Sequence, residues 1–270
     1  DLDAFAGAQL VERSARELAV TRKLAHRVID VTVRRTVGEL ELFERTTRRY
    51  RKPAWNIDST TINGREVGVR VRTVLEKPFC NLIHFERNLP SLRRGRDPKL
   101  LIVAPMAGHF PTLLRGTVRD LLPYFEIYLT EWEDARRVPR TEGNFDLDDY
   151  IDYLTEFFGY FRGNVHVMAV CQPTVPVFAA VSLMEARGDR SVPRSMTLMA
   201  GPIDTQVNPT EVNRFAARHT IHWFERHVIT QVPWPYPGMA RDVYPGFLQL
   251  SGFMGMNLDR HLTAHRDLFH

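Results

Sequence analysis

The sequence predicts an α/β fold with a mostly parallel sheet and helices on both faces. Between residues 99 and 200, short apolar runs alternate with longer helical segments. The apolar runs are continuous, which is typical of strands that are buried on both faces. The resulting β-α-β-α-β-α-β order needs crossover connections, and these favour parallel strands.

The expected elements follow in chain order. The pair Asn63-Gly64 separates two strand-like runs and indicates a hairpin turn. We expect strands over residues 59–62, 67–75, 81–87, 100–104, 126–130, 165–170 and 195–200. We expect helices over residues 112–122, from Asp146 or Asp148 to Phe161, and over residues 172–187 and 212–228.

Three regions differ in character. Residues 1–52 are rich in charged helical sequence, and residues 53–204 carry the strand and helix alternation. Residues 205–270 contain Pro, Gly, aromatic residues and Met in a pattern that suits a helical and irregular cap. The missing initiator Met and the end of the chain in cap-like sequence lead us to expect a fragment that lacks the last strands of its sheet.

Composition excludes several classes of protein. The chain has 270 residues, of which 44% are hydrophobic and 25% charged, as in an ordinary globular domain. Two cysteines provide no disulfide framework, so we expect a cytoplasmic protein. The net charge of +4 comes from basic clusters without the aromatic interleaving of a nucleic-acid module. These clusters are interpreted as solvated faces, with a weak surface for an anionic granule coat as the alternative.

The apolar run 165–184 raises the question of a membrane span. It contains His166, Gln172, Pro173 and Pro176, which a strand, a turn and a helix accommodate better than a bilayer. We therefore expect no membrane span.

The segment around Cys171 carries the chemistry. A buried strand runs directly into a helix with Cys171 at the junction, where α/β-hydrolases place their nucleophile. The compact flanking positions are Ala169 and Pro173. A thiol at a helix N-terminus is favoured as thiolate, and the N–H of Gln172 is expected to donate to an oxyanion. The alternative is a buried cysteine that only packs.

The loop after the strand 100–104 is the second signal. The N–H of Met106 is the expected second oxyanion donor, since this donor follows an earlier strand in such folds. Gly108 permits close backbone approach, and His109 is expected to shape the site. The alternative is an ordinary turn. Cys80 is expected to be structural.

At this point the sequence resembles the intracellular poly(3-hydroxybutyrate) depolymerases. The matching stretches are VLEKPFC (residues 74–80), PMAGHFPTLL (105–114), DAR (134–136), VCQPTVPV (170–177), GPID (201–204) and YPGFLQ (244–249). The resemblance implies an α/β-hydrolase with Cys171 at the nucleophile position. It also implies action on polymer in storage granules, with granule coat proteins as further candidate partners and with no metal or organic cofactor.

The family's acid and histidine follow late strands, and no residue of this chain matches them. Asp204 is a formal acid candidate, and His219, His222, His227, His261 and His265 are formal histidine candidates. We expect the catalytic acid and histidine to lie beyond residue 270. In the cap, Trp234, Tyr236, Tyr244 and Phe247 are candidates for an apolar polymer surface, with plain packing as the alternative.

Three other functions compete with ester hydrolysis of the polymer. A polyhydroxyalkanoate synthase uses the same acyl-enzyme logic, but synthases resemble G-x-C-x-G where this chain has Ala169 and Pro173. A granule-binding module with an inert Cys171 is the non-enzymatic hypothesis. An esterase or thioesterase for small acyl substrates is the third.

Overall fold

The computed structural model describes residues 52–90, 95–106, 110–246 and 248–249. The chain divides into two compact units, residues 1–51 and 52–270, and all described residues belong to the second. The helical region expected over residues 1–52 therefore lies outside the described residues, except for Lys52.

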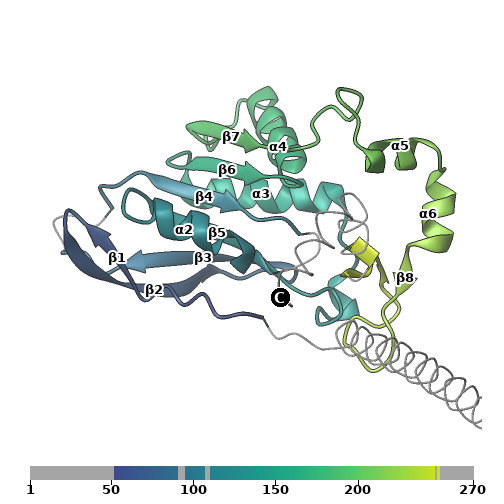
Figure 1. Ribbon diagram of the computed structural model, residues 1–270, viewed down its shortest axis with the longest axis horizontal. Helices are drawn as coiled ribbons and strands as arrows, with labels where there is room; N and C mark the ends of the chain where they lie inside the picture. Colours follow the sequence, from purple (N-terminus) through teal and green to yellow (C-terminus); the bar gives the residue numbers. More distant parts are fainter. Residues whose placement is uncertain (1–51, 91–94, 107–109, 247, 250–270) are drawn as a thin grey trace, which may run out of the picture. The chain divides into compact units, whose positions relative to one another are not determined.

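A seven-stranded sheet forms the centre of this unit (Figure 1). The spatial order is β1-β2-β3-β5-β4-β6-β7. The strands span β1 Ser59–Ile62, β2 Arg65–Leu75, β3 Cys80–Arg87, β4 Lys99–Val103, β5 Glu126–Trp132, β6 His166–Val170 and β7 Ser195–Met199. The pairings among β5, β4, β6 and β7 are parallel, and those among β1, β2, β3 and β5 are antiparallel. The predicted α/β class is confirmed, with an antiparallel extension at one edge of the parallel part.

The predicted hairpin turn is present between β1 and β2. Ile62 pairs with Arg65, so the loop has two residues, and both Asn63 (φ 51°) and Gly64 (φ 75°) are in the left-handed region. Two consecutive positive φ values define the turn type that Asn-Gly favours, because its twist matches that of the flanking strands.

Helices cover both faces of the sheet (Figure 1). One core contains Val118 and Leu122 at α2 (Arg115–Leu121) together with Leu100 and Ile102 of β4. The other contains the apolar face of α3 (Leu147–Phe161), residues of α4 (Thr174–Ala186), and Leu101 and Val103 of β4. Successive residues of β4 therefore enter opposite cores, which explains why its sequence is apolar without interruption.

Helix α3 begins as its sequence predicts. Asp146 is the N-cap residue and accepts hydrogen bonds from the N–H groups of Asp148 and Asp149. The Asp149 carboxylate accepts in return from the Asp146 N–H, so two of the helix's unpaired N–H groups and the cap residue are satisfied.

Two predicted helices are divided in the structure. Residues 112–122 form a 3₁₀ turn, η1 (Pro111–Leu114), before α2. The single helix expected over 212–228 is wrong, because α5 (Glu211–Ala217) and α6 (Ile221–His227) are separate. The Thr220 side chain accepts from the Trp223 N–H and caps α6, which starts a new helix where a continuous pattern had been expected.

The cap-like sequence is anchored by one buried arginine. The short strands β8 (Thr230–Gln231) and β9 (Asp242–Val243) pair antiparallel, and Arg241 precedes β9. Arg241 is buried, with 3% of the residue exposed, and its guanidinium donates to the carbonyls of Ala135, Val138, Pro139 and Gly143. These bonds fix the loop after β5, which includes η2 (Arg140–Glu142), against residues more than ninety positions later in the chain.

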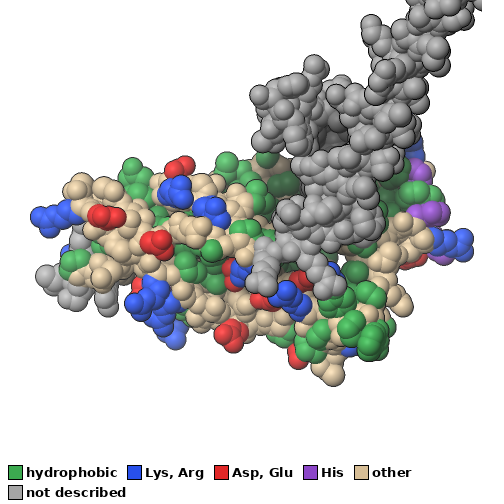
Figure 2. Space-filling view, turned by 60° about the horizontal axis from the view of Figure 1, so that its bottom comes forward, with side chains coloured by type: hydrophobic (Ala, Val, Ile, Leu, Met, Phe, Trp, Pro, Cys, Tyr) green, Lys and Arg blue, Asp and Glu red, His purple; other side chains and the backbone are tan. Residues whose placement is uncertain are grey.

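The surface of the described part carries both signs of charge. On the face in Figure 2, Lys and Arg side chains are interspersed with Asp and Glu, and hydrophobic side chains gather toward one end. In the part of the chain that the structure describes, no helix has the length and apolar character needed to cross a membrane.

Candidate active site

The candidate site lies where the order of the parallel strands reverses. From β4 the chain crosses to β5 on one side, and then to β6 on the other side of β4. Loops at the carboxyl ends of the strands diverge at such a point, and open α/β sheets bind ligands in the crevice between them. Met106 follows β4 and Cys171 follows β6, so both lie at the carboxyl ends of neighbouring parallel strands, where such folds bind ligands.

The backbone of Cys171 turns sharply between β6 and α4. Its φ is +67°, in the left-handed region that costs an L residue with a Cβ roughly 1–2 kcal/mol. The Cys171 N–H donates to the Met199 carbonyl at 2.8 Å. The Cys171 carbonyl accepts from the N–H of Thr174 at 3.1 Å and from its hydroxyl at 2.8 Å. These bonds hold the turn, and the Cys171 residue remains exposed at its outer side.

The neighbours of Cys171 explain how the sequence accommodates this turn. Ala169 is fully buried on β6, and Pro173 is the N-cap residue of α4, where its missing N–H removes no helical hydrogen bond. The predicted placement of a strand, a sharp turn and a helix with compact flanks is thus observed. A strained, exposed residue held by several hydrogen bonds is typical of functional sites.

The two expected oxyanion residues lie in direct contact. The Met106 N–H donates to the side-chain Oε1 of Gln172 at 3.0 Å. The strand end before Met106 is held from β5, because the Thr130 hydroxyl accepts from the Ala104 N–H and the Trp132 indole donates to the Ala104 carbonyl, both at 2.9 Å. Only the backbone of Gln172 had been expected to take part in the site. Its side-chain contact was missed because residues 66 positions apart share no sequence signal.

The other residues predicted for the site and for the polymer surface lie in different places. Gly108, His109 and Phe247 lie outside the described residues. Trp234 is 80% exposed, and Tyr244 is exposed with its carbonyl accepting from the Gln249 amide. Tyr236 is half-buried, and the Arg136 guanidinium lies 5.3 Å from its ring centroid.

The formal acid and histidine candidates that the structure describes are engaged locally. The Asp204 carboxylate accepts from the Gln206 N–H two residues away. Nδ1 of His219 and Nδ1 of His227 each lie 2.8 Å from a carbonyl one helical turn earlier, and His222 contacts Glu225. His261 and His265 lie outside the described residues. The triad acid and histidine therefore stay unassigned.

Cys80 differs from Cys171 in its burial. It is fully buried in the core beneath α3, and this burial raises the pKa of its thiol well above the usual range. A protonated thiol is a poor nucleophile, which agrees with the structural role expected for Cys80.

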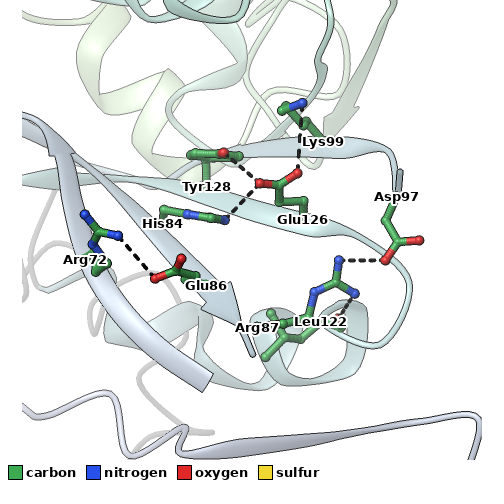
Figure 3. Close-up of polar contacts among 9 residues, drawn as sticks. All are labelled: Arg72, His84, Glu86, Arg87, Asp97, Lys99, Leu122, Glu126 and Tyr128. Atoms are coloured by element: carbon green, nitrogen blue, oxygen red, sulfur yellow. Dashed lines mark hydrogen bonds and ion pairs between the residues drawn. The ribbon is translucent and has the colours of Figure 1, made fainter. Parts of the chain in front are cut away.

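A second group of titratable side chains, shown in Figure 3, lies at the amino ends of β4 and β5. Lys99 and Glu126 are the first residues of β4 and β5, whereas Cys171 follows the last residue of β6. The Glu126 carboxylate lies 3.3 Å from the His84 imidazole, accepts from the Tyr128 hydroxyl at 3.0 Å, and lies 3.9 Å from the Lys99 ammonium. The contact with His84 is the main cause that lowers the pKa of Glu126, although partial burial opposes it. This cluster stabilises the amino ends of the strands and is not part of the Cys171 site.

The comparisons with known proteins identify one family. Residues 200–270 match the family model described as PHB de-polymerase C-terminus, where PHB is poly(3-hydroxybutyrate). No curated protein matches the chain significantly. The matched range begins directly after β7 and contains the GPID and YPGFLQ stretches, so the expected family resemblance is confirmed there.

Proposed function

We propose that this chain, whose residues 200–270 match the family model of the PHB depolymerase C-terminus, hydrolyses ester bonds of poly(3-hydroxybutyrate) with Cys171 as the nucleophile. The observation that carries the proposal is the exposed Cys171 with a φ of +67° at the carboxyl end of β6. The family match points to poly(3-hydroxybutyrate) as the substrate. The turn exposes a thiol that can attack the ester bonds of this polymer.

The reaction follows from the residues around the turn. The Cys171 thiolate attacks the ester carbonyl carbon, so a C–S bond forms and the carbonyl oxygen becomes an oxyanion. The N–H groups of Gln172 and Met106 donate to this oxyanion. Collapse breaks the ester C–O bond and leaves a thioester on Cys171. The departing alkoxide takes up the proton that the Cys171 thiol lost when it became a thiolate, so one part of the polymer leaves as an alcohol. Water then cleaves the thioester, releases the carboxylic acid and restores the thiol.

Exposed apolar side chains in the family-matched range suit a polyester substrate. Among the residues of this range that the structure describes, the exposed large hydrophobic ones are Ile203, Val207, Val212, Phe215, Ile221, Trp234, Met239 and Tyr244. A polyester chain offers methyl and methylene groups but no charge, so contact with such side chains is favourable. We assign Trp234, Tyr236 and Tyr244 to this polymer-facing surface, with the protein acting on cytoplasmic storage granules.

The test is release of 3-hydroxybutyrate from amorphous granules by the full gene product that contains these residues. Cys171→Ala is expected to abolish release while granule binding persists, and Cys80→Ala, which removes the other thiol, is expected to retain release. Release by Cys171→Ala would disprove the nucleophile assignment. Granule binding without release by the wild type would favour the non-catalytic binding module. Incorporation of hydroxyacyl-CoA into polymer would favour a synthase, and turnover of soluble chromogenic esters alone would favour a small-substrate esterase.

A further inference from the structure

The hydrogen bond between Met106 and Gln172 joins the two loops of the candidate site. Its donor is the N–H that the proposed mechanism assigns to the oxyanion, and its acceptor is the side-chain amide oxygen of the residue that supplies the other N–H. We propose that the Gln172 side chain occupies the oxyanion donor of the free protein, so that an ester carbonyl has to displace Gln172 Oε1 before Met106 can stabilise the transition state. This inference rests on the proposed function of Cys171.

The chemistry of the two acceptors makes them competitors. An amide oxygen and an ester oxygen both accept one hydrogen bond from a backbone N–H in the plane of the carbonyl group. The Met106 N–H has one proton, and a donor that bonds Gln172 Oε1 at 3.0 Å has to be released or shared before it serves a substrate. The negative oxyanion of the tetrahedral state accepts more strongly than a neutral amide, so the exchange becomes favourable as the reaction proceeds.

The loop that carries Met106 does not need Gln172 for its position. Ala104, two residues earlier, is bonded on both sides of its backbone to side chains of β5, namely Thr130 and Trp132. Thr130 is fully buried, so this anchor remains when the Gln172 side chain is shortened. Loss of the side chain should therefore free the Met106 N–H instead of displacing it.

The expected change in acylation rate follows from the net free energy of one neutral hydrogen bond. Relative to water, such a bond changes an equilibrium by between about two- and tenfold. Gln172→Ala removes the acceptor, and Gln172→Asn keeps the amide but shortens the side chain by one methylene, so both should accelerate acylation by that factor. Gln172→Glu places a carboxylate on the Met106 N–H, which binds it more tightly and repels the oxyanion, and should slow acylation by about tenfold or more.

Two reactions at the same sulfur separate this effect from a change in thiol reactivity. Alkylation by iodoacetamide forms a C–S bond and expels iodide without an oxyanion. Acylation by p-nitrophenyl butyrate forms a C–S bond through an oxyanion and expels p-nitrophenolate, which is coloured. We would measure both rates at Cys171 in the full gene product and in each Gln172 variant, with the site of modification verified by mass spectrometry.

The ratio of the acylation rate to the alkylation rate is the decisive quantity. We expect it to rise by between about two- and tenfold in Gln172→Ala and in Gln172→Asn, and to fall in Gln172→Glu. An unchanged ratio in both shortened variants, or a lower one, would overturn the competition. A wild type that is alkylated but never acylated at Cys171 would instead disprove the proposed function.

Discussion

Gly201 lies so close to Thr174 that no side chain fits between them. A Cβ on Gly201 would overlap the side chain of Thr174, including its hydroxyl oxygen. Thr174 is fully buried, and its hydroxyl donates to the Cys171 carbonyl. The backbone just after β7 therefore packs directly on the side chain that holds the Cys171 turn, and a residue with a Cβ does not fit at position 201.

Gly201→Ala is expected to disrupt the Cys171 turn. The added methyl has to push Thr174 away from the Cys171 carbonyl, and overpacking of this kind costs about 1–3 kcal/mol or more. Urea unfolding measures the loss of stability, and iodoacetamide measures the altered reactivity of Cys171. Gly116→Ala is the matched control, because Gly116 lies in α2 with no atom within 4 Å of an added Cβ. Equal stability and reactivity of Gly201→Ala and wild type would refute the close contact.

The strain at Cys171 predicts a difference in stability between two variants that lack the thiol. Cys171→Gly and Cys171→Ala both remove the thiol, but only glycine adopts a φ of +67° without steric cost. After allowance for the larger entropy of glycine in the unfolded chain, we expect Cys171→Gly to be more stable than Cys171→Ala by roughly 1 kcal/mol. Urea unfolding of the two proteins provides the comparison. If alanine were as stable as glycine, the turn would store no strain at this residue.

Arg241 should be difficult to replace even by lysine. A lysine ammonium cannot reach the four backbone carbonyls that the guanidinium contacts, so buried acceptors lose their donors. We expect Arg241→Lys to lower the free energy of unfolding by about 2–3 kcal/mol. The control is Arg137→Lys, at an exposed arginine in the same loop. A loss no larger than in the control would mean that the loop holds its conformation without Arg241.

The lowered pKa of Glu126 predicts that the stability of the protein depends on pH in the acid range. Its pKa lies below the ordinary value of 4.5 in the folded protein, mainly because of His84. A group with a lowered folded pKa contributes stability that is fully present above the unfolded pKa and is lost as pH falls through the folded pKa. The difference in unfolding free energy between wild type and Glu126→Gln should therefore shrink as pH falls below about 4.5.

Urea unfolding at several pH values tests this dependence. Glu142→Gln, at an exposed glutamate, reports the effect of removing one surface charge. A difference between wild type and Glu126→Gln that grows on acidification would contradict the expected sign.

Local sequence determined most of the strands and the turn chemistry. The Asn63-Gly64 pair, the Asp146 cap and the uninterrupted apolar strands each act through neighbours in the chain, and each is present as predicted. The division between α5 and α6 was missed, because a helical pattern of apolar residues continues through the break that the Thr220 cap introduces.

The position of Cys171 between a strand and a helix also followed from the sequence alone, since the residue types on either side of it must be compact. Only the tertiary structure decided what that turn contacts. The Met106–Gln172 hydrogen bond, the packing of Gly201 on Thr174 and the reach of Arg241 join residues that are far apart in the chain. Such contacts depend on the strand order, in which β4 lies between β5 and β6. The chain reaches β6 only about sixty residues after β4. Sequence patterns report the environment of each residue but not its distant partner, and for that reason the turn at Cys171 was predictable while the contact between Gln172 and Met106 was not.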